Sequence, residues 1–358
     1  MEVMSLTLEN FKRFKERTLD FRDPETGLAK DLIVLVGKNG SGKSSVLQAI
    51  AAMLGAATGR LQSPADLDWP GFDWGLVNKG WQRPLSIQME VGFSNDEIQA
   101  TRDYFERTYV AARPDAIKPG ESPIVKLRLD PETQLARAGT HSEFYQFRGR
   151  EYARIILRQS PEGFALFKRV GTVFWYTEQR TTNSLTPAEE NGQELRFDMD
   201  ILRRRLSDFM QFHERIKRGE RQLWLGQRDL FADLEKAYRT VFPAHRFDGP
   251  VPRTEIDEVL AEPWFYLYDG RRPYELGEMS GGERAIFPII FDFANWNTHN
   301  SVILIDELEL HLHPPLQQGL LRALRDLGEN NQFIVTTHSD AVVAAMPPDA
   351  LLYRLEAD

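Results

Sequence analysis

Runs of consecutive apolar residues predict the buried strands of a parallel sheet. Such runs lie at 32–36, 172–176, 301–305, 332–336 and 351–355. Patterns typical of helices separate them, at 45–54, 284–296, 317–327 and 341–346. A strand that is buried on both faces carries few polar residues, and a crossover helix usually leads to its parallel neighbour. The alternation therefore predicts an α/β fold whose core holds a mainly parallel sheet.

Segments that alternate apolar and polar residues predict antiparallel strands outside this core. Residues 85–93 alternate regularly, and residues 95–112 carry apolar side chains at helical spacing. Further segments that we interpret as strands lie at 124–129, 144–147, 152–157 and 164–169. We therefore expect an antiparallel β-arm. The first residues, 3–8 and 18–21, predict a hairpin-like entry to the core.

Two amphipathic helices are expected between the arm and the last core strands. One face of the first carries Leu202, Leu206, Phe209, His213 and Ile216, and one face of the second carries Leu230, Leu234, Tyr238 and Val241. These spacings are those of a helix that buries one side. The predicted division is a nucleotide-binding core (1–54 and 278–358, with strand 172–180), a β-rich insertion (55–171) and a helical insertion (181–277).

Composition narrows the class of protein. The chain of 358 residues is 42% hydrophobic and 27% charged, with a net charge of −9 and no cysteine. The lack of cysteine excludes disulfides and thiolate metal sites, and it fits a reducing compartment. The sequence shows neither a basic-apolar leader nor a run of about 18 apolar residues. We therefore expect a cytoplasmic protein without membrane contact.

A phosphate-binding loop follows the first predicted core strand. Its pattern, G-x-x-x-x-G-K-[ST], stands between a buried strand and a helix, which is the context that this motif requires. Loop N–H groups and the helix N-terminus would bind the phosphates of ATP, Lys43 the β- and γ-phosphates, and the Ser44 hydroxyl Mg²⁺. The expected ATP-binding residues are Gly37, Asn39, Gly40, Ser41, Gly42, Lys43, Ser44 and Ser45.

Polar residues end two further core strands. Asp306 and Glu307 follow the strand at 301–305, and His338 comes soon after the strand at 332–336. Ligands of open α/β sheets bind beyond the carboxyl ends of the strands. We expect Asp306 to hold Mg²⁺ and Glu307 to deprotonate the attacking water.

A second glycine turn precedes the acidic pair. Ser280-Gly281-Gly282-Glu283 begins a predicted helix, so its N–H groups and the helix dipole form another anion site. One γ-phosphate does not need two such sites in one chain. Two chains that face each other head-to-tail do, because each can supply its Ser-Gly-Gly turn to the ATP of the other.

The order of these motifs resembles the ABC-type ATPase superfamily, in the soluble branch that contains SMC, RecF and OLD-type ATPases. The resemblance is carried by the phosphate loop, SGGE, ILIDELELHLHP and TTHSD, and by the N-terminal Asn10-Phe11-Lys12-Arg13-Phe14, which is similar to the branch's NF+xF segment. It implies that Gln179 senses Mg²⁺ and the γ-phosphate, that His338 contacts the γ-phosphate, and that Lys12 or Arg13 touches the nucleotide. The alternative for Gln179 is an ordinary loop residue, and for His338 a strand-end histidine.

Departures from the family narrow the function. Glu283 stands where transporters usually carry glutamine, no long coiled coil is predicted, and no second acidic cluster suggests the nuclease of complete OLD proteins. We therefore expect an ATP-dependent homodimer, or a higher oligomer, that regulates a separately encoded nuclease or toxin in an anti-phage defence system. The alternative is a RecF-like repair ATPase that binds DNA directly.

Two arginine-rich segments are candidates for DNA or RNA contact. One holds Arg203, Arg204, Arg205, Arg215, Lys217, Arg218 and Arg221, and the other holds Arg148, Arg150, Arg154 and Arg158. The alternative is the solvated face of a helix, because acidic residues are interspersed. His311 and His313 are two residues apart without a nearby cysteine, which makes a poor metal site. Packing or a dimer contact is the preferred interpretation for them.

Overall fold

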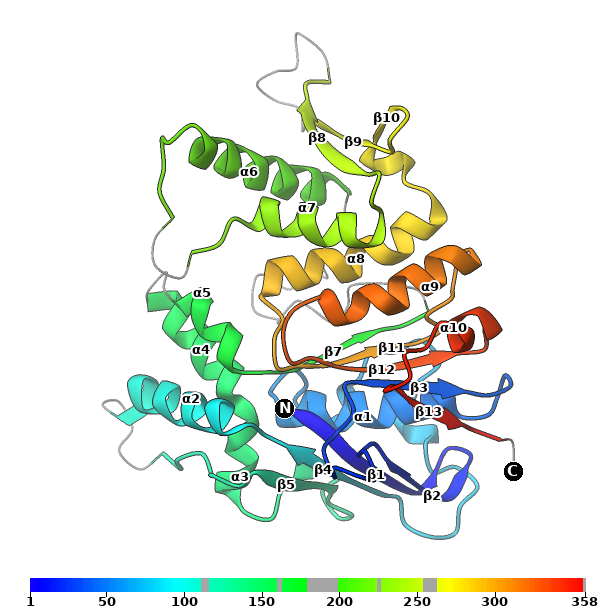
Figure 1. Ribbon diagram of the computed structural model, residues 1–358. Coiled ribbons are helices and arrows are strands. Elements are labelled where there is room, and N and C mark those ends of the chain that lie inside the picture. Colours follow the sequence, from blue (N-terminus) through cyan, green and yellow to red (C-terminus); the bar gives the residue numbers. More distant parts are fainter. Residues whose placement is uncertain (111–115, 160–162, 179–198, 224–226, 254–262, 357–358) are drawn as a thin grey trace.

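The computed structural model describes residues 1–110, 116–159, 163–178, 199–223, 227–253 and 263–356 (Figure 1). Its elements form layers. An antiparallel sheet covers one side of helix α1 (Lys43–Ala57), and a parallel sheet covers the other. Helices α8 (Gly281–Trp296) and α9 (Pro314–Ala323) cover the far face of the parallel sheet. A lobe of helices and short strands lies beyond α8.

The parallel sheet is the predicted α/β core. Its strand order is β13-β3-β12-β11-β7, and every neighbouring pair is parallel. The strands are β3 (Leu32–Val36), β7 (Val173–Tyr176), β11 (Val302–Ile305), β12 (Gln332–Thr337) and β13 (Leu351–Arg354). Strands β3, β7, β11 and β12 are buried along nearly their whole length, as the apolar runs predict, whereas the edge strand β13 is only partly buried. Ile33 and Leu35 pack toward α1, while Leu32 and Val34 pack toward α8 and α9.

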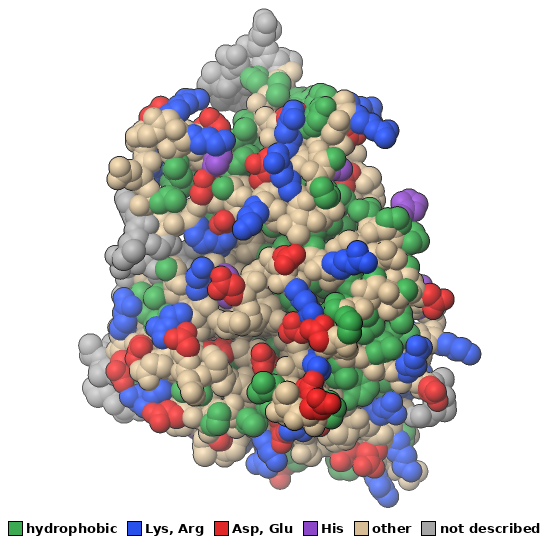
Figure 2. All heavy atoms as spheres, viewed as in Figure 1, with side chains coloured by type: hydrophobic (Ala, Val, Ile, Leu, Met, Phe, Trp, Pro, Cys, Tyr) green, Lys and Arg blue, Asp and Glu red, His purple; other side chains and the backbone are tan. Residues whose placement is uncertain are grey.

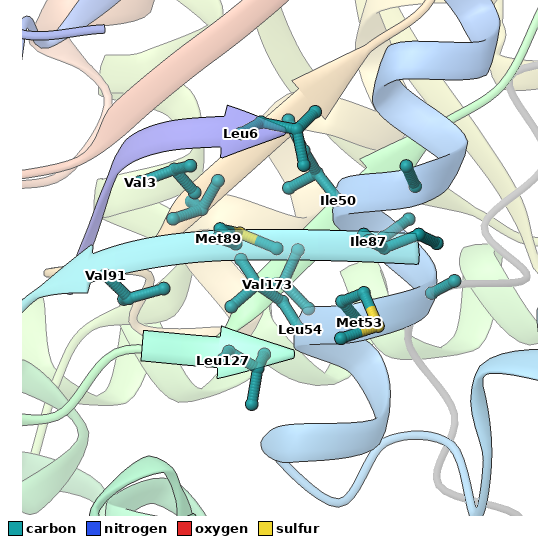
Figure 3. Close-up of a cluster of buried hydrophobic side chains, with 14 of the residues drawn as sticks. Val3, Leu6, Ile50, Met53, Leu54, Ile87, Met89, Val91, Leu127 and Val173 are labelled. Atoms are coloured by element: carbon teal, nitrogen blue, oxygen red, sulfur yellow. The ribbon is translucent and has the colours of Figure 1, made fainter. Parts of the chain in front are cut away.

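The antiparallel sheet joins the N-terminal hairpin to later strands. Its order is β2-β1-β4-β5-β6, formed by β1 (Glu2–Phe11), β2 (Phe14–Asp20), β4 (Ser86–Gly92), β5 (Ile124–Leu129) and β6 (Ala136–Arg137). The alternation of β4 places Ile87, Met89 and Val91 on the α1 side, where they join the buried cluster that also holds Ile50 and Leu54 (Figure 3). The predicted hairpin and the strands at 85–93 and 124–129 are thus present.

The strands predicted at 144–147, 152–157 and 164–169 were wrong. These residues form α3 (His141–Tyr145), α4 (Gly149–Gln159), α5 (Gly163–Leu166) and the short 3₁₀ turns Gln146–Arg148 and Phe167–Arg169. Tyr152, Ala153 and Ile156 bury one helical face, at i, i+1 and i+4. They pack against α2 (Asn95–Phe105), which continues as a π-helical turn, Glu106–Val110.

The lobe beyond α8 mixes helices with a small sheet. The two predicted amphipathic helices are α6 (Met199–Lys217) and α7 (Leu230–Val241). An unpredicted antiparallel sheet, in the order β10-β9-β8, accompanies them: β8 (Arg246–Val251), β9 (Trp264–Tyr268) and β10 (Pro273–Glu275). Phe265 and Leu267 of β9 join the same buried cluster as α7 and α8.

Short elements complete the described chain. They are the 3₁₀ turns Pro64–Asp66, Trp74–Leu76, Leu276–Glu278 and Leu324–Asp326, and the helix α10 (Asp340–Ala344). Within the described ranges, no helix combines the length and the apolar character that crossing a membrane requires.

Candidate nucleotide-binding site

The carboxyl ends of the core strands bring the predicted motifs to one edge of the sheet. Val36 lies opposite Thr337, and Ile305 lies opposite Val335 two residues earlier on the same strand. These pairings bring the strand ends that precede the phosphate loop, Asp306 and His338 to neighbouring positions. Figure 1 shows β3, β11 and β12 pointing to the same side. Since α8 ends shortly before β11 begins, the Ser280 turn at its start lies on that side too.

The phosphate loop has a backbone that depends on glycine. Gly40 and Gly42 have φ of 77° and 93°, in the left-handed region that glycine adopts without strain. A Cβ on Gly42 would lie 2.4 Å from Phe14 Cζ and 2.8 Å from Arg13 Cδ. The turn between β1 and β2 therefore packs directly on the loop.

The donors of this loop suit a polyphosphate. Gly42 is the N-cap of α1 and supplies no side-chain cap, and the first turn of α1 holds no acidic residue. Lys43 Nζ donates to Gly37 O at 2.8 Å and to Lys38 O at 3.3 Å, so the cation lies over the loop. Ser41 Oγ is buried and makes no hydrogen bond to the described residues. Helix N–H groups, together with a lysine that has no carboxylate partner among the described residues, fit the phosphates of ATP.

Oxygen ligands for a hard cation meet beside the loop. The buried Asp306 accepts hydrogen bonds at one oxygen, Oδ1, from Ser44 Oγ (3.0 Å) and Thr336 Oγ1 (2.6 Å). Mg²⁺ prefers oxygen ligands and typically takes one or two carboxylates plus phosphates and water. Ser44 and Asp306 therefore fit that ion. Among the described residues no group of three or more His, Cys, Asp or Glu side chains could hold a metal ion.

Thr336 also orients Glu307. Its hydroxyl oxygen accepts from Glu307 N at 2.8 Å, and Glu307 has a left-handed φ of 48°. Burial and the charges of Asp306 and Glu309 raise the pKa of Glu307, against the opposing effect of His338. A carboxyl with a raised pKa is a stronger base once ionised, which suits proton abstraction from water.

His338 is held by a residue for which the sequence analysis predicts no role. The backbone N–H of His338 donates to Glu309 Oε1 at 2.6 Å, and its ring Nδ1 lies 2.7 Å from the same oxygen. Glu309 is 7% exposed. The only sequence signal for it is its place at the start of the ELHLHP run.

The Ser280 turn is closed by its own side chains. Ser280 and Glu283 form a capping box: Ser280 N (2.8 Å) and Oγ (2.7 Å) donate to Glu283 Oε2. Glu283 Oε1 accepts from Tyr238 Oη at 2.9 Å and from Tyr274 Oη. Burial alone would raise the pKa of Glu283, but hydrogen bonds from Tyr274, Ser280 and Tyr238 lower it.

The ELHLHP run touches this turn. A Cβ on Gly282 would lie 3.5 Å from Leu312 Cδ2 and 3.6 Å from His311 O, so Gly282 permits close approach. His311 and His313 are both exposed. A dimer contact at these two histidines stays a prediction.

Lys12 lies near the first turns of α1. Its Nζ donates to Gln48 Oε1 at 2.6 Å and lies 5.1 Å from the centre of the Phe72 ring. Burial lowers its pKa. Gln179, the third predicted metal-binding residue, lies outside the described residues.

The arginine-rich segments are partly buried inside the protein. Arg150 is 5% exposed and donates to the carbonyls of Trp296 and Val170, and Arg203 is 9% exposed and pairs with Glu275 at 2.8 Å. These two side chains therefore do not form part of a solvated helix face or of a surface for nucleic acid. On the face shown in Figure 2, Lys and Arg are interspersed with Asp and Glu.

Comparison with known proteins identifies the family. Residues 32–344 match the family described as "AAA domain, putative AbiEii toxin, Type IV TA system", and residues 1–61 match a second AAA domain family. The chain belongs to this AAA-domain family. It carries an ATPase domain with the fold that its motifs predict.

Individual relatives of this AAA-domain protein match parts of longer chains. The "Retron Ec83 probable ATPase" of Escherichia coli is 42% identical over 76 residues, which cover 18% of this chain and 14% of that protein. The "Septu protein PtuA" of Bacillus mycoides is 22% identical over 351 residues, covering 94% of this chain and 38% of that protein. The chain thus spans well under half the length of these relatives.

A solved structure shares the fold. An Smc head bound to the C-terminal winged-helix domain of ScpA superposes with a TM-score of 0.51 at 16% identity, covering 96% of this chain and 92% of that one. The predicted ABC-ATPase-like fold is thereby confirmed.

Proposed function

We propose that the protein binds ATP with Mg²⁺ at the edge of the parallel sheet and hydrolyses it. The observation that carries this proposal is the meeting of Ser44, Asp306 and Thr336, which joins the phosphate loop to the acidic strand end. Three segments far apart in the sequence converge there on oxygen atoms that suit a metal–nucleotide. A purely structural role would not require the adjacent loop to present helix N–H groups and Lys43.

Each residue of the site has its own role in hydrolysis. Lys43 exchanges the carbonyls of Gly37 and Lys38 for phosphate oxygens when ATP binds. Ser44 and Asp306 would hold Mg²⁺, which would supply positive charge beside the phosphates. Glu307 accepts the proton of the attacking water, and His338 contacts the γ-phosphate. Glu307, Asp306 and His338 stand just after core strands, and Lys43 and Ser44 stand at the start of α1 after the phosphate loop.

The proposed assembly is a head-to-tail dimer that ATP closes. Ser280, Gly281 and Gly282 of one chain complete the site of the other. The ATPase cycle regulates a separately encoded nuclease or toxin in anti-phage defence. The matches to a retron ATPase and a Septu protein support this role, as does a family description that names a toxin system.

The test is Glu307→Gln, with the exposed Glu16→Gln as the matched control. Glu307→Gln should bind ATP normally, lose turnover by about 100-fold or more, and accumulate as a dimer in light scattering. Turnover at the wild-type rate would remove Glu307 from the role of base. A monomer in saturating ATP would contradict the head-to-tail assembly.

A RecF-like repair ATPase is the second candidate, and the Smc-head fold is the observation that favours it. Purifying the Glu307→Gln protein with ATP, co-expressed with its flanking genes, separates the two. A nuclease or toxin subunit in fixed stoichiometry supports the defence role. Bound DNA without a protein partner, with affinity that falls steeply as salt rises, supports repair.

A further inference from the structure

Glu309 lies between the acidic pair and the LHLHP residues, and its side chain is turned inward. The Glu309 side chain is 6% exposed, whereas the His338 side chain that it contacts is 52% exposed. A buried carboxylate is costly unless it is paired and hydrogen-bonded. The contacts of Glu309 with His338 must therefore compensate the cost of its burial.

The contacts fix both the backbone and the ring of His338. Glu309 Oε1 accepts from the His338 backbone N–H at 2.6 Å and lies 2.7 Å from ring Nδ1. A carboxylate only accepts hydrogen bonds, so a hydrogen bond across this 2.7 Å contact requires the proton on Nδ1. The other ring nitrogen, Nε2, is then the one that can meet a ligand.

The loop around Glu309 is tied to the catalytic edge. Leu308 N donates to Thr336 O, Leu310 N to Glu307 O, and Leu312 N to Glu309 O, each at 2.9 Å. Glu309 and Glu307 therefore share one short loop fastened to β12. The second oxygen, Oε2, is buried and makes no hydrogen bond within the described part of the chain. Within the described residues, the hydrogen-bonding contacts of the Glu309 side chain are those with His338.

We propose that Glu309 is a positioning residue that fixes the tautomer and orientation of His338, so that Nε2 faces the γ-phosphate. The inference rests on the proposed ATPase function, because it assigns a partner to one of its residues. A neighbour that orients a histidine sets which nitrogen is available for chemistry. Glu309 would act through His338 and not on ATP itself.

The kinetic test is Glu309→Gln, with Glu329→Gln as the matched control. Glu329 is an exposed glutamate near another histidine, His299. Glutamine carries both a donor and an acceptor, so it no longer enforces a proton on Nδ1. We expect kcat to fall by about 10- to 100-fold while the ATP Kd stays within about twofold. Glu309→Asp, which keeps the carboxylate, should recover part of the loss.

A double-mutant cycle separates positioning from a structural role. In a His338→Ala background, Glu309→Gln should change kcat little, because the side chain through which it acts is gone. An equal loss in both backgrounds would overturn the proposal.

A spectroscopic readout makes the proposal independent of hydrolysis. With ¹⁵N-labelled histidine, the His338 ring of the nucleotide-free protein should show the Nδ1–H tautomer, and Glu309→Gln should shift it. His338→Ala identifies the signal by its loss. An unchanged tautomer in Glu309→Gln would refute the proposal even if ATP is hydrolysed. If the wild-type protein does not hydrolyse ATP, the proposed function fails while the tautomer result still decides whether Glu309 positions His338.

Discussion

The starts of α1 and α8 are two helix N-termini that the sequence predicts alike and the structure makes differently. Both follow a glycine turn, and both lie on the side of the strand ends. At α1 the N-cap is Gly42, with no side-chain cap and no acidic residue in the first turn. At α8 the N-cap is Ser280, and Glu283 closes a capping box.

The difference shows which anion site is ready and which must change. The first turn of α1 has neither a side-chain cap nor an acidic residue, so its N–H groups present a positive helix end to a phosphate. At α8 the Ser280 hydroxyl already donates to Glu283, and Glu283 places a negative charge in the first turn. For Ser280 to serve the ATP of a partner chain, its hydroxyl must exchange one acceptor for another. The three predictions below test this contrast.

The largest effect is expected at the start of α1, which has no side-chain cap. Lys43→Ala removes the cation over the loop and should weaken ATP binding and hydrolysis by about 100-fold or more. Lys38→Ala is the matched control, because Lys38 belongs to the same loop but its side chain is exposed. Fluorescent-nucleotide binding and phosphate release provide the measurements. Equal losses in both variants would mean that general positive charge, not the position of Lys43, binds the phosphates.

A substitution in the capping box at the start of α8 should affect stability as well as turnover. Glu283→Ala leaves the Tyr238 and Tyr274 hydroxyls and Ser280 N without their acceptor, which should cost about 2–4 kcal/mol in urea unfolding. Asp340→Ala, in the first turn of α10, removes an exposed carboxylate from a helix start and should cost about 0.3–1 kcal/mol. A Glu283→Ala loss no larger than that of the control would show that the capping box is not needed to hold the turn.

The pH dependence of Glu283 has a definite sign. Its folded-state pKa is lowered from the usual 4.5, so its contribution to stability is present above pH 4.5 and is lost as the pH falls through the folded-state pKa. Glu283→Gln cannot titrate and should flatten this part of the acid unfolding curve. A wild-type curve and a Glu283→Gln curve that run parallel would contradict the lowered pKa.

The two helix starts also show how far the sequence could go. The phosphate loop is predictable because eight positions, a strand and a helix agree. Ser280 to Glu283 fits S-x-x-E, the capping-box pattern, as well as an anion site, and the local sequence does not choose between them. Of the two tyrosines that donate to Glu283, Tyr238 on α7 is 45 residues away in the chain and Tyr274 on β10 is 9 residues away, and no local pattern pairs either with Glu283, so only the folded protein reveals these contacts.

The wrong strands at 144–147 and 152–157 have a local cause. Short apolar runs fit a strand or a buried helix equally well, because length and caps decide between them. A cap was present: Thr140 and Glu143 form a capping box at the start of α3, another S/T-x-x-E pattern. The five-strand core was predictable since each strand is a continuous apolar run. The contact between Glu309 and His338 was not, because it joins two loops through side chains.

The smallest expected effect lies in the middle of α8, where a second buried carboxyl behaves in the opposite way to Glu283. Asp292 accepts from Tyr176 Oη at 3.1 Å. Burial raises its pKa well above the usual 3.8, although the Tyr176 hydrogen bond and Arg60 oppose the shift. A group with a raised folded-state pKa gives stability that is fully present below the unfolded pKa and is lost as the pH rises.

The stability of Asp292→Asn relative to the wild type should therefore increase as the pH rises. Asparagine keeps an acceptor for the Tyr176 hydroxyl and has no charge to bury, so its Tm relative to the wild type should increase by a few degrees between about pH 5 and about pH 8. Asp208→Asn, an exposed aspartate on α6, should show no such trend. A Tm difference that does not change with pH would mean that Asp292 is ionised in the folded protein. In that case the hydrogen bond from Tyr176 and the charge of Arg60 lower the pKa of Asp292 more than burial raises it. Helix α8 would then carry two ionised carboxylates, Glu283 in its first turn and Asp292 in its middle.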